Sequence, residues 1–449
     1  MADAATFMLN DSAEAPARHR ARPALETRIW VSTASASIGD GLRLAALPLA
    51  VAAITNDPLQ VAGLTLAQRV PPLVLALPAG VILDRVDPFR VMVACQRVRV
   101  VLVLSLAGAV AAQGVLGVGA MLAAVYALAM LLAAMEVFGD VAAQVVVQLL
   151  VADERLERTN SRVVAGQMLG EEFLGPPTGG WLFSLGRWPA FVGIGLAYAI
   201  SALVLNGGLR RRSGAADART SDPTDTSPTA ALSPVRSGWR EAAAAIPRET
   251  RQGLAVVVGN RDLLVQAAWT SVMNAANGAV GAVFVLFALN TLGLNGTAYG
   301  ALLTAGGIGG VLGAGLAGVV ARHVPRRAMM ISTSLLASLC TLTLGSMDSF
   351  VAVFALQGVA ALCGVMFSVV ARSYRQSITP TEFAGRTTSV YRLLSLGSVP
   401  LGALAGGILA TVQNPGLSIV VAGALMLAAT VGAALFLRRD VPSVPRQPR

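Results

Sequence analysis

Lysine is missing from this chain, and aromatic, histidine and cysteine residues are scarce. All 34 basic residues among the 449 are arginine, aromatic residues make up 5% of the chain, and there are 2 histidines and 3 cysteines. Without lysine the chain has neither a P-loop lysine nor a Schiff-base lysine. Charged residues are 13% of the chain, about half the share usual in soluble domains. These features exclude a P-loop ATPase and an ordinary soluble globular enzyme.

The few histidines and cysteines do not form a recognisable metal or disulfide pattern. Cys95, Cys340 and Cys363 lie in apolar stretches at spacings that suit neither use. His19 lies in an arginine-rich tail, and His323 lies far from it beside an arginine. We therefore expect no metal, no cofactor and no enzymatic activity. A membrane-embedded enzyme that uses a pair of buried carboxylates is a remote alternative.

Long apolar blocks, separated by glycine, proline and charge clusters, dominate the rest of the chain. Hydrophobic residues make up 55% of it, and the mean hydropathy is +0.67. About 20 apolar residues cross a bilayer core. The pattern predicts an all-α integral membrane protein with twelve transmembrane helices in two six-helix bundles. The predicted spans are residues 28–53, 59–83, 90–112, 117–150, 157–185, 189–209, 262–289, 297–321, 326–346, 350–374, 383–411 and 416–437.

The arginines gather in alternate connections between these spans, and only Arg187 breaks the alternation. Because cytoplasmic loops of membrane proteins are enriched in basic residues, this asymmetry places both termini in the cytosol. It also accounts for the net charge of +10, since a basic surface faces anionic membrane lipid. The prediction is a multi-pass protein of the cell membrane that contacts lipid and does not bind nucleic acid.

The polar segments divide the chain into parts. We expect two disordered cytosolic tails, two helical bundles, and a Ser-, Thr-, Pro- and Arg-rich cytosolic linker whose final part is an amphipathic helix. In chain order these parts are residues 1–27 (tail), 28–209 (N-terminal six-helix bundle), 210–261 (linker), 262–437 (C-terminal six-helix bundle) and 438–449 (tail).

The two bundles resemble each other weakly. At an offset of 237 residues Gly41 corresponds to Gly278, and Gly63 corresponds to Gly300. Both pairs occupy the same place in the order of spans. Parallel six-span repeats of this kind place a substrate path at their interface, near the middle of the membrane.

The connection after the second predicted span reads GVILDRVDPFR over residues 80–90. It resembles the loop signature of the major facilitator superfamily, in which an aspartate and arginines follow a glycine. The resemblance implies that the loop is a gate, whose aspartate bonds a neighbouring helix end and arginines such as Arg97 or Arg99. The second half has Arg322 at the equivalent place, so this acidic contact is one-sided. The residues that match are Gly80, Asp84, Arg85 and Arg90.

The fifth predicted span contains the sequence GPPTGG over residues 175–180. Its residues Gly175, Pro176, Gly179 and Gly180 resemble the glycine–proline–x–x–glycine–glycine motif of proton-coupled exporters in the same superfamily. Small residues let helices approach closely, and proline bends the helix. The resemblance implies a pivot for alternating access and favours export. Packing alone is the alternative, and Glu171 departs from the family's upstream glycines.

Ionisable residues inside the spans are costly in a membrane and mark functional sites. The acids are Asp40, Glu136, Asp140, Glu171 and Glu172, and the arginines are Arg43, Arg69 and Arg392. We interpret the acids as candidates for proton coupling and the arginines as their ion-pair partners. Asp40 is the first choice for the proton carrier, with Glu136 and Asp140 as the competing pair. An ion-pair network that never titrates is the alternative.

Three short stretches indicate a particular branch of the superfamily. Residues 39–41 (GDG), 77–80 (LPAG) and 159–161 (TNS) resemble the enterobactin-exporter and macrolide-efflux group. The resemblance implies a monomeric transporter that expels amphiphilic small molecules, such as drugs, antibiotics or secondary metabolites, in exchange for protons. A dedicated siderophore or metabolite exporter, or a nutrient importer of the same fold, remains an alternative. The aromatic residues expected to contact substrate are Trp30, Phe138, Trp269, Phe284, Phe287 and Tyr374.

Overall fold

The computed structural model describes residues 23–83, 86–111, 117–150, 153–217, 251–380 and 383–437, and within these ranges it contains helices and no strands. The chain crosses the molecule twelve times. The first six crossings are α2 (Pro23–Ala52), α3 (Pro58–Leu83), α4 (Pro88–Ala111), α5 (Val118–Leu150), the continuous helix α6–η1–α7 (Asp153–Met168, Leu169–Leu174, Gly175–Leu185) and α8 (Arg187–Asp217). The second six are α10–η3 (Arg261–Leu286, Phe287–Thr291), α11 (Gly296–Val320), α12 (Arg326–Leu344), α13 (Phe350–Ile378), α14 (Ala384–Val412) and α15 (Pro415–Phe436).

Nine of these crossings in the described ranges are long and apolar enough to span a membrane by length and composition alone. The other three are α2, α3 and α6–η1–α7. Each of these three carries charged residues inside its span: Asp40 and Arg43, Arg69, and the pair Glu171 and Glu172. The prediction of an all-α protein with twelve transmembrane helices is confirmed.

The helix ends differ most from the prediction in two places. Helix α2 begins at Pro23 rather than at residue 28. Proline suits the first turn of a helix because its missing N–H would have no partner there. Helix α8 continues to Asp217, into the segment predicted to be linker, because its arginines and alanines favour helix beyond the apolar span. The predicted tails before residue 23 and after residue 437, and linker residues 218–250, lie outside the described residues, whereas residues 251–259 form a helix.

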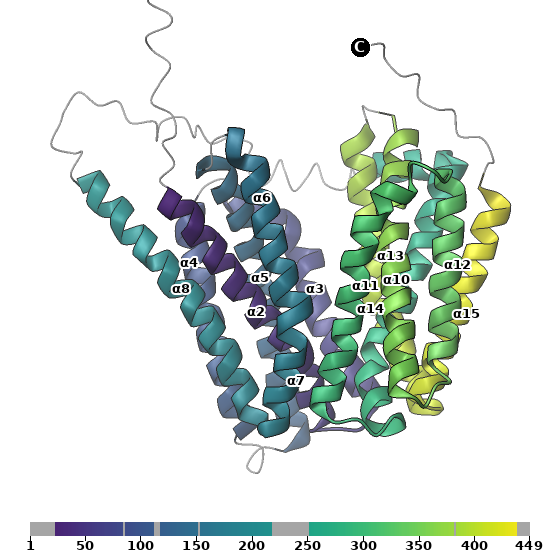
Figure 1. Cartoon of the computed structure of the whole chain (residues 1–449), viewed down its shortest axis with the longest axis horizontal. Helices are drawn as coiled ribbons and strands as arrows, with labels where there is room; N and C mark the ends of the chain where they lie inside the picture. Colours follow the sequence, from purple (N-terminus) through teal and green to yellow (C-terminus); the bar gives the residue numbers. More distant parts are fainter. Residues whose placement is uncertain are drawn as a thin grey trace, which may run out of the picture.

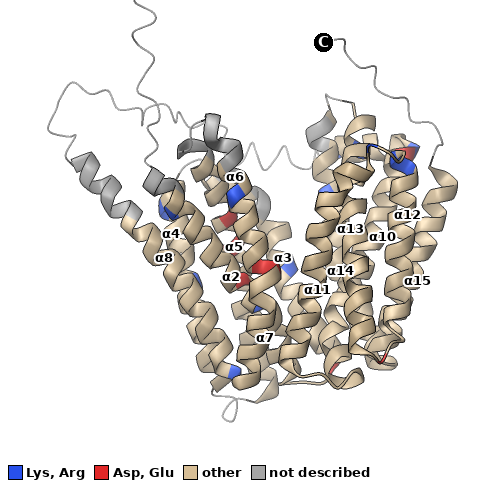
Figure 2. Cartoon of the chain, in the orientation of Figure 1, with Lys and Arg blue, Asp and Glu red and all other residues tan. Residues whose placement is uncertain are grey.

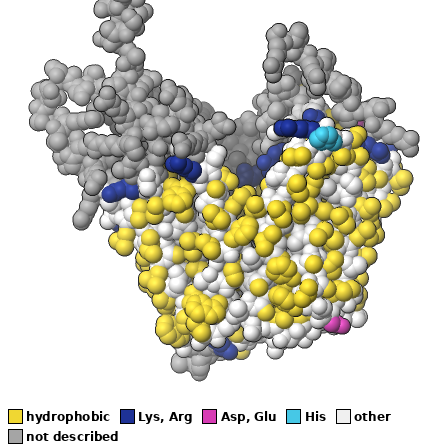
Figure 3. Space-filling view, in the orientation of Figure 1, with side chains coloured by type: hydrophobic (Ala, Val, Ile, Leu, Met, Phe, Trp, Pro, Cys, Tyr) yellow, Lys and Arg dark blue, Asp and Glu magenta, His cyan; other side chains and the backbone are white. Residues whose placement is uncertain are grey.

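Helices α2 to α8 form one bundle and α10 to α15 the other, here named the N-bundle and the C-bundle (Figure 1). The two bundles touch at one end and diverge toward the other, which Figure 1 shows at the top. Figure 2 shows most of the basic residues toward this upper end, and Figure 3 shows a broad hydrophobic belt below it. Apolar side chains on the outside are what a lipid-facing surface requires.

The contact between the bundles, here named the closed end, consists of two matching helix pairs. Helix α7 packs on α11, and α3 packs on α14. Glycines permit both approaches: a Cβ added to Gly180 would collide with the backbone of Gly296, and one added to Gly407 would lie 2.7 Å from the Cβ of Ala62. Hydrogen bonds join the same two places: one links the Ser184 and Thr297 hydroxyls (3.1 Å), and Thr411 donates the other to Asp57 (3.3 Å). The closed end is thus a nearly symmetric seam of close backbone contacts.

Candidate substrate and proton pathway

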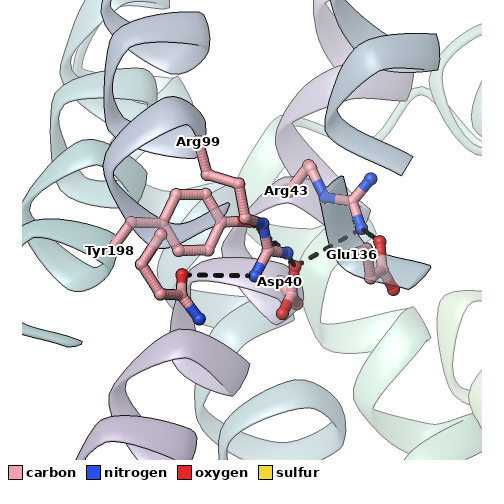
Figure 4. Close-up of polar contacts among 6 residues, drawn as sticks. Asp40, Arg43, Arg99, Glu136 and Tyr198 are labelled. Carbon is pink, nitrogen blue, oxygen red and sulfur yellow. Dashed lines mark hydrogen bonds and ion pairs between the residues drawn. The ribbon is translucent and has the colours of Figure 1, made fainter. Parts of the chain in front are cut away.

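A network of charged side chains lies inside the N-bundle, with Asp40 of α2 at its centre (Figure 4). The Oδ1 atom of Asp40 accepts hydrogen bonds from Arg99 of α4 and from the Tyr198 hydroxyl of α8, the latter at 2.8 Å. Arg43 lies 3.4 Å from the same oxygen and also pairs with Glu136 of α5. Two acids and two arginines of balanced charge therefore tie α2, α4 and α5 together, and Tyr198 adds α8.

Arg99 is held from several sides. Only 4% of its side chain is exposed, its guanidinium lies 4.1 Å from the centre of the Tyr198 ring, and its Nη1 atom donates to Gln96 at 3.5 Å. A buried charge is tolerated only when it is paired and hydrogen-bonded. The sequence assigned Arg97 or Arg99 to the gating loop. In the structure Arg99 pairs with Asp40, because it faces the bundle interior, and Arg97 donates to Asn206 at 2.9 Å.

The other three acids predicted to lie inside the N-bundle spans are outside this balanced network. Asp140 and Glu171 are exposed within the structure, and Glu172 is partly buried. Within the described part of the chain, none of the three forms an ion pair within 4 Å. Asp140 and Glu171 nevertheless lie within electrostatic reach of Asp40 and Glu136. The N-bundle therefore holds both neutralised acids and unpaired ones.

A cavity of about 710 Å³ lies between the bundles, a size within the usual range for small-molecule sites. The N-bundle lines it with residues of α2, α3, α6 and η1, among them Gln68, Arg69 and Glu172. The C-bundle contributes the other lining residues. This part of the surface is rich in glycine and alanine and carries the amides of Asn274 and Gln357. The surface is therefore smooth and mostly apolar, with a few polar groups.

The predicted aromatic contacts lie mostly elsewhere. Phe284 lines the cavity, as does Tyr299, which the sequence did not single out. The C-bundle core buries Trp269 and Tyr374, where Trp269 packs on Phe367. In this chain these two rings pack inside the C-bundle core, whereas many residues of the cavity wall are glycine or alanine. The other three rings are also placed away from the cavity: Trp30 donates to the carbonyl of Arg162, Phe138 packs in the N-bundle core, and Phe287 is fully buried.

The glycine–proline motif lies where α2, α7 and α11 meet. Gly175 and Gly179 approach the backbone of α2, and a Cβ added to Gly179 would lie 2.9 Å from the Cα atom of Leu42. Gly180 and Pro176 face α11 at the closed end instead. Directly before the motif, residues 169–174 form the π-helix η1, whose wider register brings the Gly175 N–H to the carbonyl of Gly170. Pro176 and Pro177 cannot donate backbone hydrogen bonds, which favours this shift of register.

The predicted gating loop is described only in part. Gly80 belongs to α3, and Arg90 forms an exposed ion pair with Asp87 at 3.7 Å. Asp84 and Arg85 lie outside the described residues, so their gating role stays a prediction. Arg392 of α14 is exposed and does not line the cavity, whereas Arg69 does.

Two helical bundles around a central cavity, with charges buried in one of them, define a membrane transporter. The family profile described as Major Facilitator Superfamily matches residues 29–289 and 267–449. The chain belongs to the Major Facilitator Superfamily, and it is a multi-pass membrane transporter of small molecules. Among curated protein sequences, none matches the chain significantly.

Solved structures share the fold at low sequence identity. A bacterial homologue of the iron transporter ferroportin, in an inward-facing state, matches with a TM-score of 0.70 and 15% identity over 92% of this chain and 98% of its own. A bacterial metal transporter matches with 0.66 and 16% over 94% and 99%, and the nucleoside transporter NupG with 0.65 and 10% over 93% and 100%. At these identities the likeness shows the fold alone.

Proposed function

We propose that the protein is a proton-coupled exporter of amphiphilic small molecules. The single observation that carries this proposal is the division of the N-bundle acids into neutralised and unpaired sets beside a largely apolar cavity. Proton coupling requires a carboxylate that can take up and release a proton. Binding of an amphiphile requires an apolar surface with few polar groups. The resemblance of residues 175–180 to an exporter motif supports the direction of transport.

Orientation is consistent with loading of the substrate from the cytosol. Arginines are concentrated at the end where the bundles diverge, while the closed end carries few. By the positive-inside rule the open end faces the cytosol and the closed end faces outward. A substrate from the cytosol or from the inner leaflet would then reach the cavity in this conformation. An importer of the same fold would have to load its substrate in the opposite state.

The hydrogen bonds and ion pairs of Asp40 argue against this residue as the proton carrier. Three donors surround one oxygen of that carboxylate and tie it to Arg43 of its own helix and to α4 and α8. Asp140 and Glu171 have no such partner in the described structure and lie nearby. We infer that Asp140 or Glu171 carries the proton, and that Asp40 organises the helices around it.

Reconstitution into liposomes containing a pH-sensitive dye tests both steps. An outwardly directed gradient of an amphiphilic probe such as 2-aminodecanoic acid should drive proton movement in the opposite direction, and an imposed pH gradient should drive the probe uphill. Asp140→Asn or Glu171→Gln should abolish uphill movement while permitting downhill exchange. Asp348→Asn, at an exposed carboxylate in a loop of the C-bundle, is the matched control and should change neither flux.

Two results would contradict the proposal. Probe movement that is indifferent to the pH gradient in the unmodified protein would remove proton coupling. Full uphill transport in both Asp140→Asn and Glu171→Gln would remove the assignment of the carrier and return it to Asp40 or Glu136. Reversing the gradients in the same liposomes distinguishes export from import.

A further inference from the structure

The charged side chains that line the cavity all lie on the wall formed by the N-bundle. Among its lining residues only Arg69 and Glu172 carry a formal charge at neutral pH, and both belong to the N-bundle. Neither forms an ion pair within 4 Å among the residues that the structure describes. Unpaired charges at membrane depth are costly and usually face a partner, a ligand or water. One positive and one negative group are thus presented to whatever occupies the cavity.

Local structure fixes Glu172 in this wall. It belongs to the π-helix η1, which packs against α11 at Gly307. A Cβ added to Gly307 would lie 2.7 Å from the carbonyl oxygen of Glu172 and 2.8 Å from its Cβ. Glycine at position 307 therefore lets η1 approach the C-bundle at the edge of the cavity, where the carboxylate is exposed to the occupant.

The opposite wall, from the C-bundle, is uncharged. It offers the amides of Asn277 and Gln357 and the side-chain oxygen of Asn274, whose Nδ2 atom donates hydrogen bonds to Ser395. At Gly281 and Gly364 an added Cβ would meet nothing within 4 Å. These two glycines leave open volume beside the amide groups. An apolar body fits against such a surface, and the amides can receive its polar substituents.

We propose that the cavity binds a zwitterionic amphiphile, whose anionic group pairs with Arg69, whose cationic group pairs with Glu172, and whose apolar body lies on the C-bundle wall. The inference rests on the proposed function and narrows its substrate class. A purely cationic occupant would leave Arg69 unpaired and would be repelled by it. A purely anionic occupant would meet the same problem at Glu172, so only a molecule with both charges neutralises the wall.

Four probes on one scaffold test this inference. They are 2-aminodecanoic acid, which is zwitterionic, its cationic methyl ester, its anionic N-acetyl derivative and the neutral N-acetyl methyl ester. Binding to the full chain in lipid nanodiscs is measured at pH 7 from the shift of the unfolding midpoint, with probe concentrations corrected for partition into empty nanodiscs. The zwitterion should bind at least about tenfold more tightly than each other probe, since charge-assisted contacts are strong.

Substitutions of Arg69 and Glu172 test which charged group of the probe each residue binds. Arg69→Gln should bring the zwitterion and the methyl ester to equal affinity while preserving the preference over the N-acetyl derivative. Glu172→Gln should have the converse effect. Arg392→Gln, which removes an exposed arginine away from the cavity, should preserve both preferences. Equal binding of the neutral probe and the zwitterion by the unmodified protein would overturn the inference, as would unchanged preferences in both cavity variants.

The wild-type ranking tests the inference even if a variant does not fold. Because binding is measured at equilibrium without any gradient, the two proposals fail separately. Charge-selective binding without pH-driven flux would contradict proton coupling and leave the zwitterion site standing. pH-driven flux of 2-aminodecanoic acid, with equal binding of all four probes, would contradict the site and leave proton coupling standing.

Discussion

The hydroxyl of Tyr198 donates a 2.8 Å hydrogen bond to the carboxylate of Asp40, across 158 residues of sequence. Tyr198 is fully buried, and its ring also lies beneath the guanidinium of Arg99. The ring packs so closely on α2 that a Cβ added to Gly39 would lie 2.6 Å from its Cε1 atom. One tyrosine therefore positions the acid, its arginine partner and the helix that carries the acid.

Removing this hydroxyl should destabilise the protein. Tyr198→Phe retains the ring but leaves one bond fewer to Asp40, and we expect the free energy of unfolding to fall by about 1 kcal/mol. Denaturant unfolding of the purified protein in detergent measures the loss. Tyr374→Phe is the matched control, because the Tyr374 hydroxyl is buried without a hydrogen-bond partner among the described residues. Its removal should leave stability unchanged or slightly higher, and equal losses in both variants would contradict the prediction.

Neutralising Asp40 should cost more than removing its tyrosine partner. Asp40→Asn leaves the buried guanidinium of Arg99 without a counter-charge, and breaking a buried pair in this way costs about 3–5 kcal/mol. The double variant Asp40→Asn/Arg99→Gln removes both charges and should lose less stability than Asp40→Asn alone. The same unfolding measurement tests this prediction. If the stability loss of the double variant equals the sum of the losses of the two single variants, the two side chains do not interact.

Much of the fold could be predicted from the sequence, because a bilayer requires apolar blocks of defined length and the chain supplies them. The pair Asp40 and Arg43 was visible as well, since residues three apart share a helix face. Arg99 and Tyr198 were not visible as their partners. Both lie in helices whose lipid-facing and bundle-facing sides are equally apolar, so composition does not show which way α4 and α8 are rotated.

The cavity was harder to predict for a related reason. The sequence directed attention to aromatic residues such as Trp269 and Tyr374, yet these rings fill the C-bundle core. The cavity wall is made by residues that resemble ordinary helix-packing glycines in sequence. Gly364 opens onto the cavity, whereas Gly309 packs against the backbone of α13 at Gly358, and only the packed structure separates the two roles.

The seam at the closed end should control which conformation the transporter prefers. A methyl group at Gly180 would collide with the backbone carbonyl of Gly296 and lie 3.2 Å from the Cα atom of Gly300. Overpacking of this kind costs about 1–3 kcal/mol, and only the state with α7 against α11 bears it. Gly180→Ala should therefore shift the population toward the state in which this end is open.

Spin labels at positions 56 and 346, both exposed in closed-end loops of opposite bundles, measure that shift in a background without the native cysteines. Gly180→Ala should lengthen the dominant distance between the labels. Gly432→Ala on α15, where an added Cβ meets nothing within 4 Å, should leave the distance distribution unchanged. A distribution in Gly180→Ala that matches the unmodified protein would mean that the seam does not bear on the equilibrium.

Filling the cavity from the C-bundle wall should alter substrate size selection and leave folding intact. Gly364 lines the cavity with open space beside it. Gly364→Leu therefore places about four carbons in the cavity without a backbone clash. Leucine also stabilises a helix by roughly 0.5–1 kcal/mol relative to glycine. We expect the unfolding midpoint to hold or rise, while affinity for long-chain amphiphiles falls more than affinity for short-chain ones. Binding of a chain-length series in nanodiscs measures the effect. The control is Gly432→Leu, at a position with the same open surroundings but outside the cavity, and it should leave the dependence of affinity on chain length unchanged. If Gly364→Leu shows the same chain-length dependence as the unmodified protein, substrates do not contact this wall.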